Sequence, residues 1–250
     1  VFSYFYELYR ATGDTDFIRM MAEKNGGASE GLPYDPYRDD GEAVRAEVDR
    51  VLAEDGARYK PQSADYRNYR LAMLRGESGL PALWISYDNE ARSHRHRDLL
   101  NMGLYYRNLD LMPDFGYPPV NMGAWDSEYV QWYQGTAGHN TVVSDHRYPL
   151  SESGSGVTEL WLPGKRVQAV TIGTDPSARK KRMSGAVRTA VLVNTAPGEG
   201  YVLDVFRARR SGADSYTLSL SAGWGSLQTE GLTLTEAENP FPENVTRAAK

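Results

Sequence analysis

The segment AVRTAVLVNTAPGEGYVLDVFRARR, residues 186–210, holds two apolar runs on either side of a short stretch rich in proline and glycine. Both runs are rich in valine and carry aromatic or leucine residues, which pack well on a pleated sheet. The intervening TAPGEG, residues 195–200, is typical of a hairpin loop. The segment therefore predicts a β-hairpin, and the same texture can be followed outward along the chain.

Short apolar runs separated by glycine, proline, asparagine and aspartate continue upstream of this hairpin to about Tyr66, and also downstream of it. Regularly spaced short strands with turn signals between them indicate an antiparallel β-sandwich or barrel. We therefore expect a mainly β protein over residues 61–250. The runs are RLAML (70–74), ALWISYD (82–88), NMGLYYRNLDLM (101–112), HNTVVSD (139–145), RVQAVTIG (166–173) and YTLSLSAG (216–223).

Residues 1–60 have a different pattern, in which apolar residues recur at helical spacing. One helix is expected near the start, a second within GDTDFIRMMAEKN (13–25), and a third within DDGEAVRAEVDRVLAEDG (39–56). Three short helices do not make an obvious domain, so we interpret them as the end of a helical domain. The chain opens on VFSYFYELYR, without an initiator methionine, and we expect it to be a fragment of a longer protein.

Composition excludes several classes of function. The formal net charge of −5 argues against a nucleic-acid-binding protein with a broad basic face. Cysteine is absent, which excludes disulfides, thiolate metal sites and cysteine nucleophiles. No apolar run approaches the ~20 residues that a membrane-spanning helix needs. The sequence also contains no P-loop, dinucleotide-binding fingerprint or nucleophile elbow.

Two of the four histidines, His94 and His96, lie in SHRHRDLLNMGLYY, residues 93–106. If this segment is a strand, side chains two residues apart point to the same face, and both imidazoles project together. Such a pair can share a metal ion, or one histidine can bind metal while the other transfers protons. The alternative is a polar sheet face that binds nothing.

Asp114 in LMPDFGYP and His139 in TAGHNTVV are the next candidate ligands. Together with His96 they form a His–Asp–His set that suits Zn²⁺, with one coordination position left for water or another donor. Asp98 would share the face of His96 and could accept a hydrogen bond from a ligand histidine. No spacing rule connects these residues, and Asp114 is equally typical of a turn.

These residues, in their order, resemble the C-terminal β-domain of heparinase II/III-type polysaccharide lyases, a group that includes alginate and oligoalginate lyases. The matching elements are H-x-H-x-D at 94–98, P-D-x-G-Y at 113–117 and H-N-T-V-x-x-D at 139–145. The resemblance covers residues 66–225. It implies an antiparallel β-sandwich over 61–250, and residues 1–60 resemble the last helices of the α/α toroid that precedes this domain in the family.

The resemblance implies a lyase that cleaves a uronic-acid-containing polysaccharide by β-elimination. It implies a catalytic role for His94, with His96, Asp114 and His139 as ligands of a structural Zn²⁺. The catalytic tyrosine and the residues that neutralise the substrate carboxylate are expected upstream in the toroid, so this chain would hold part of an active site. Arg95 departs from the small residue that is typical between the two histidines.

Candidate substrate contacts lie on either side of these ligands. Arg95 and Arg97 could bind substrate anions, while Trp125 and Tyr133 could stack on sugar rings. The alternative for the aromatic residues is that they pack back onto the sheet.

The partners expected from the resemblance are an acidic polysaccharide or oligosaccharide and the upstream toroid, and the expected location is periplasmic or secreted. Two other functions stay open. One is a non-catalytic carbohydrate-binding or structural β-sandwich domain. The other is a zinc hydrolase with its metal open to substrate.

Overall fold

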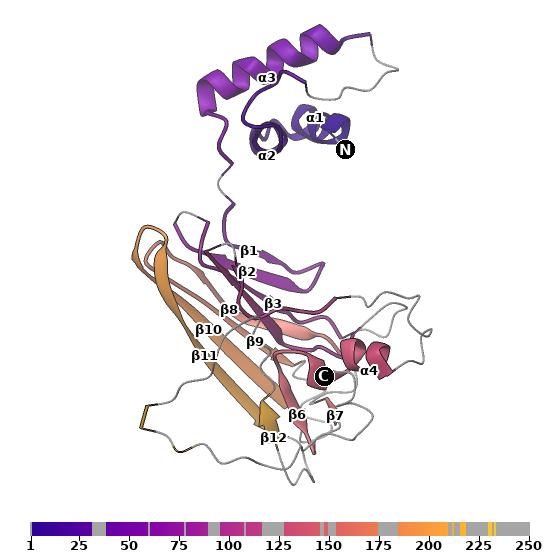
Figure 1. Ribbon diagram of the computed structural model, residues 1–250, viewed down its shortest axis with the longest axis vertical. Helices are drawn as coiled ribbons and strands as arrows, with labels where there is room; N and C mark the ends of the chain where they lie inside the picture. Colours follow the sequence, from indigo (N-terminus) through magenta and orange to yellow (C-terminus); the bar gives the residue numbers. More distant parts are fainter. Residues whose placement is uncertain are drawn as a thin grey trace. The chain divides into compact units, whose positions relative to one another are not determined.

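The computed structural model describes residues 2–31, 39–59, 61–77, 79–89, 96–107, 109–116, 128–145, 148–149, 154–174, 185–209, 212, 216–218, 230–231 and 233. The chain divides into two compact units, Val1–Pro61 and Gln62–Lys250 (Figure 1). The first contains helices and the second contains the sheets.

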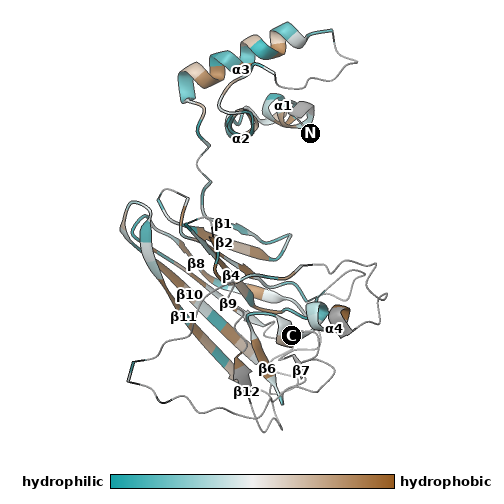
Figure 2. Cartoon of the chain, viewed as in Figure 1, coloured by the Kyte–Doolittle hydropathy of each residue, from teal (hydrophilic) through white to brown (hydrophobic). Residues whose placement is uncertain are grey.

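The first unit contains the three predicted helices, whose assignment to an α/α toroid stays a prediction. Helix α3 shows hydrophobic and hydrophilic residues in alternation (Figure 2), and its Val48 and Val51 are buried against Ile18 and Met21 of α2. Pairs three residues apart lie on one helix face, which explains this packing. No helix among the described residues is long and apolar enough to cross a membrane. The helices are α1 (Phe2–Thr12), α2 (Asp16–Lys24) and α3 (Gly41–Asp55).

The second unit begins with a five-stranded antiparallel sheet in the order β1-β2-β3-β4-β5. Each strand pairs with its neighbour in sequence, so the sheet is a simple meander. Its strands are β1 (Ala64–Tyr66), β2 (Leu71–Arg75), β3 (Ala82–Ser86), β4 (Asn101–Tyr106) and β5 (Leu109–Asp110).

A four-stranded antiparallel sheet in the order β11-β10-β9-β8 follows, and β12-β6-β7 form a small third sheet. The predicted hairpin is confirmed, because β10 and β11 pair along their length up to Ala196 opposite Glu199. The strands are β6 (Val142–Ser144), β7 (Tyr148–Pro149), β8 (Gly156–Pro163), β9 (Val167–Thr174), β10 (Gly185–Ala196), β11 (Glu199–Arg209) and β12 (Tyr216–Leu218).

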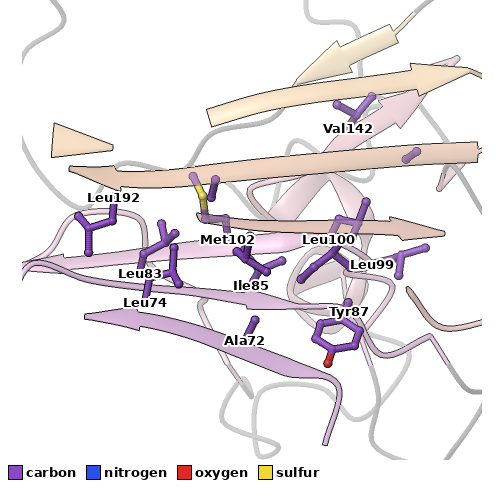
Figure 3. Packing of buried hydrophobic residues seen from close by; sticks show 14 residues of the cluster. Ala72, Leu74, Leu83, Ile85, Tyr87, Leu99, Leu100, Met102, Val142 and Leu192 are labelled. Carbon is purple, nitrogen blue, oxygen red and sulfur yellow. The ribbon is translucent and has the colours of Figure 1, made fainter. Parts of the chain in front are cut away.

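The main core lies between the five-stranded and four-stranded sheets (Figure 3). Leu74, Leu83 and Ile85 of the first sheet pack in one cluster with Ile172 and Leu192 of the second. Strand β10 alternates buried and partly exposed residues, as expected for a strand with one face on a core. The predicted mainly β fold with an antiparallel sandwich is therefore confirmed.

The connection between the first sheet and β6 contains two short helices that the sequence analysis did not predict. These are α4 (Glu128–Gln134) and the 3-10 helix η1 (Thr136–Gly138). Gly138 allows the second to fold back on the first, because a Cβ atom there would lie 2.4 Å from the Trp132 carbonyl oxygen. This fold-back sets the position of the next residue, His139.

Candidate metal centre

The three metal ligands predicted from the sequence lie close together. His96 precedes β4, Asp114 follows β5, and His139 lies between η1 and β6. The Nδ1 atom of His96 is 3.0 Å from Nε2 of His139. The carboxylate of Asp114 lies 3.5 Å from Nε2 of His139 and 3.9 Å from Nδ1 of His96. One ligand atom from each residue can therefore be chosen so that all lie within 4.8 Å of one another.

The local structure predicted for His96 is wrong. It lies in a turn-containing segment before β4, and not on a strand. The backbone N–H of Arg97 donates to the Gln134 carbonyl at 2.8 Å, and that of Asn101 donates to the Asp98 carbonyl at 2.8 Å. These bonds are those of a turn held against α4, so strand alternation no longer pairs His96 with His94.

A backbone carbonyl orients the His139 ring. Its Nδ1 lies 2.7 Å from the carbonyl oxygen of Gly135, which can only accept, so Nδ1 carries the proton. In the neutral ring Nε2 then presents a lone pair toward His96 and Asp114. A ligand histidine in a metal site is typically held by such a bond from its other ring nitrogen.

Two donors orient the Asp114 carboxylate. The side-chain amide of Asn101 donates to Oδ2 at 2.8 Å, and the backbone N–H of Gly116 donates to Oδ1 at 2.7 Å. Gly116 has φ +62°, a conformation that favours glycine, which explains the predicted turn after Asp114. Asp114 is therefore both a turn residue and a candidate ligand.

Burial favours the form of both histidines that binds metal. His139 is 1% exposed and the His96 side chain is 12% exposed. Burial lowers the pKa of His139, and the charge of Asp114 and the Gly135 carbonyl partly oppose this effect. Burial also lowers the pKa of His96, and the neighbouring His139 adds to this, whereas Asp114 and Asp98 oppose it. Neutral imidazoles beside a carboxylate form a donor set that zinc accepts.

Asn101 is a residue of the site that sequence reasoning missed. It is fully buried, and its Oδ1 accepts from the backbone N–H of Asn140 at 2.9 Å while its amide holds Asp114. Asn140 itself donates from Nδ2 to the Pro113 carbonyl at 3.3 Å. The one signal for Asn101 was a polar residue at the start of an otherwise apolar run.

The predicted substrate contacts are only partly described by the structure. His94, Arg95 and Trp125 lie outside the described residues. Arg97 is exposed. Tyr133 is half-buried and meets Phe115 edge-on, with ring centroids 5.8 Å apart. Phe115 follows Asp114 in the chain, so Tyr133 packs on a neighbour of that candidate ligand. Substrate contact by Tyr133 or Arg97 stays a prediction.

Comparison with solved structures supports the fold. A structure described as the heparinase III BT4657 gene product with methylated lysines has a TM-score of 0.57 and 20% identity, and the match covers 73% of this chain and 27% of that one. Another, described as heparinase III, has a TM-score of 0.51 and 15% identity, and the match covers 85% of this chain and 37% of that one. The chain thus spans well under half the length of either protein. A search of curated proteins found no match.

The family comparison covers the site itself. Residues 86–224 match the family described as "Heparinase II/III-like, C-terminal". This range is more than half of the chain, and it includes His96, Asp114 and His139 together with Asn101, which orients one of them. The chain therefore belongs to the heparinase II/III-like C-terminal family.

Proposed function

We propose that this chain is the β-domain of a polysaccharide lyase that cleaves a uronic-acid-containing polysaccharide by β-elimination, and that its catalytic partner is an upstream α/α toroid. Family membership and the fold shared with two proteins described as heparinase III support this proposal. A location in the periplasm or outside the cell, where such polymers occur, is part of the same proposal.

β-Elimination makes three chemical demands. A base removes the proton from C5 of the uronate, the C4–O4 bond breaks as a C4–C5 double bond forms, and an acid returns a proton to the departing O4. The C5 proton is acidic enough only when donors neutralise the adjacent carboxylate. We assign an acid–base role to His94 and anion binding to Arg95 and Arg97. Trp125 and Tyr133 are the proposed stacking residues.

The observation that carries the metal part of the proposal is the convergence of His96, Asp114 and His139. We propose that they hold a structural Zn²⁺, which would bind these segments to one another. His94 is two residues from His96, so its Cα lies within about 7 Å of that of His96. An anchored His96 would therefore limit where His94 can reach, which is how a structural ion could serve catalysis.

Metal analysis of the purified 250-residue chain tests the zinc proposal. We expect close to one zinc per chain, lost in His139→Ala and retained in His146→Ala. His146 is the one histidine that lies outside the H-x-H-x-D and H-N-T-V-x-x-D elements. Equal zinc content in the two variants would contradict the assignment of ligands.

The lyase proposal is tested with the protein that carries this chain and its toroid, against heparan sulfate, alginate, ulvan and other uronate polymers. We expect a product with the near-ultraviolet absorbance of an unsaturated uronate, and a large loss of turnover in His94→Ala with zinc retained. Unchanged turnover in His94→Ala would favour the non-catalytic domain. Cleavage without the double bond would favour a hydrolase.

A further inference from the structure

A buried arginine of the four-stranded sheet contacts the backbone on either side of the candidate metal centre. Arg188 of β10 is 0% exposed, and its guanidinium makes four hydrogen bonds at its two ends. A buried cation is tolerated only when it is paired and its N–H groups have acceptors. The identity of those acceptors indicates what the residue does.

One end of the guanidinium is paired with a carboxylate. Nε and Nη2 of Arg188 donate to the two oxygens of Asp204 on β11, at 2.9 and 2.7 Å. Phe206 of the same strand lies under the guanidinium, with 5.2 Å between Cζ and the ring centroid. This bidentate ion pair fixes the direction in which the remaining nitrogen, Nη1, points.

The other end binds two carbonyls outside the four-stranded sheet, one just before β4 and one just before β6. Nη1 donates to the carbonyl oxygens of Leu100 and Asn140, each at 2.6 Å. Leu100 precedes Asn101, which orients Asp114, and Asn140 follows the candidate ligand His139. A single nitrogen thus joins two of the three backbone segments that form the centre, and the third, with Asp114, is held through Asn101.

The backbone at Leu100 provides an independent sign of constraint. Leu100 is fully buried and has φ +62°, a conformation that residues other than glycine rarely adopt. Such conformations persist where surrounding contacts enforce them, and they are frequent at functional sites. Here the Leu100 carbonyl meets Arg188, and the neighbouring Leu99 carbonyl accepts from the Thr141 hydroxyl at 2.8 Å.

We propose that Arg188 is a positioning residue for the metal centre, which holds the Leu100 and Asn140 backbone at the separation that lets Asp114 and His139 bind one ion. The proposal rests on the proposed zinc site. It predicts that the geometry of the centre depends on a residue that touches none of its ligands. A guanidinium suits this role because its planar fork can bind a carboxylate and both carbonyls at once, whereas an ammonium is a single point of charge.

The test uses the 250-residue chain with Zn²⁺ and Co²⁺ as probes. In Arg188→Met, which keeps much of the side-chain length, we expect Zn²⁺ affinity by chelator competition to fall about 10- to 100-fold, the range found when partners of metal ligands are removed. The visible spectrum of bound Co²⁺, which reports ligand geometry, should change. Arg188→Lys should recover part of the affinity and not the spectrum.

The matched control is Leu192→Ala, on the same strand and equally buried, which lies about 13 Å further along β10. It should lower the unfolding temperature while Zn²⁺ affinity and the Co²⁺ spectrum stay as in the wild type. If Arg188→Met does not fold, Asp204→Asn takes its place, because it weakens the hold on the guanidinium and keeps its shape. A smaller fall in affinity, about 3- to 10-fold, is then expected.

Wild-type affinity and spectrum in a folded Arg188→Met or Asp204→Asn chain would overturn the inference and leave the zinc site standing. An equal loss of affinity in Leu192→Ala would also overturn it, because a general loss of stability would then account for the effect. A wild-type chain that binds neither ion would instead overturn the zinc site, and the positioning role with it.

Discussion

Two clusters of ionisable side chains in the described part of the chain differ in their burial and in the kinds of group that meet. In the helical unit, Arg50 donates to Glu47 at 2.9 and 2.8 Å and to Glu54 at 2.6 Å, while the Tyr9 hydroxyl donates to Glu47 at 2.5 Å. We call these four residues the helical cluster. His96, Asp114 and His139 form the metal cluster. The helical cluster is largely exposed, whereas the metal cluster is mostly buried.

The two clusters bring different kinds of group together. Each Glu47 oxygen accepts from a donor, and the hydrogen bond from Arg50 is the largest cause that lowers the pKa of Glu47 to about 2. In the metal cluster, Nε2 of His139 lies 3.0 Å from Nδ1 of His96 and 3.5 Å from an Asp114 oxygen, and each Asp114 oxygen accepts a hydrogen bond from Asn101 or Gly116. Two imidazoles and a carboxylate that converge in a largely buried place match the ligand types of zinc, whereas an arginine paired with carboxylates at the surface already supplies the cation.

The largest expected effect is at the most buried ligand. His139→Ala should lower Zn²⁺ affinity by more than 100-fold, because it removes one of three protein donors and its anchor to Gly135. Chelator competition measures the loss. A variant that binds zinc as the wild type does would contradict the assignment of His139 as a ligand.

A smaller effect is expected from the residue that orients Asp114. Asn101→Ala should weaken Zn²⁺ binding about 10- to 100-fold. It should also cost about 1–3 kcal/mol of unfolding free energy, since the buried Asn140 N–H loses its acceptor. Competition titration and urea unfolding measure the two quantities.

The matched control for this variant is Asn194→Ala. Asn194 of β10 is another largely buried asparagine, and its amide donates to the carbonyl of Lys165, between β8 and β9, at 2.7 Å. It should lose stability and keep its zinc affinity. Equal zinc affinity in the two variants would remove Asn101 from the site.

A third group tests whether burial alone accounts for the contrast. Tyr87 is buried, and its hydroxyl donates to Asp65 at 2.6 Å, so its proton has an acceptor. Burial is the largest cause that raises its pKa from 10.0 to about 12. Because the pKa of Tyr87 is higher in the folded than in the unfolded protein, its protonated hydroxyl adds to the free energy of unfolding. This contribution is complete below pH 10 and is lost as the pH rises toward 12. The loss should reach at most about 3 kcal/mol.

Urea unfolding between pH 10 and pH 12 measures this loss. Tyr87→Phe should flatten the decline, whereas Tyr69→Phe, which changes an 81% exposed tyrosine, should leave it as in the wild type. Zinc affinity should be unchanged in both. A decline of equal slope in Tyr87→Phe and the wild type would contradict the assignment.

The smallest effect is expected in the helical cluster. Arg50→Gln removes bonds between exposed side chains, so the unfolding temperature should fall only slightly, and the difference from the wild type should shrink in high salt. Thermal unfolding at low and high salt measures it. A large effect that persists in high salt would show that this cluster is more than a solvated surface network.

The sequence predicted the sandwich and the three candidate ligands for different reasons. The hairpin was predicted from two valine-rich runs around TAPGEG, and this local pattern was enough for the fold although β10 places Arg188 and Asn194 on its inward face. His96, Asp114 and His139 were found through residue type and family pattern, because they are separated by 18 and 25 residues and no spacing rule connects them.

Backbone conformation around the ligands could not be predicted in this way. His-x-His fits a strand or a turn equally well, and leucine at position 100 gives no sign of the left-handed conformation found there. α4 was missed because its sequence, EYVQWYQ, is rich in residues that favour strands. Arg188 was not found either, because the inward face of β10 is known only from the structure and the partners of Arg188 are set by the tertiary fold.

The hydrogen bonds of Arg188 also place the centre in the order of synthesis. The contact between His96 and His139 spans 43 residues, whereas Arg188 reaches back 88 residues to Leu100 and 48 to Asn140. A growing chain therefore presents all three candidate ligands well before β10 exists to hold the backbone beside them. Since domains fold as units during translation, the centre would become complete only when the last long hairpin closes the sandwich. Metal uptake would then mark a finished domain rather than start its folding.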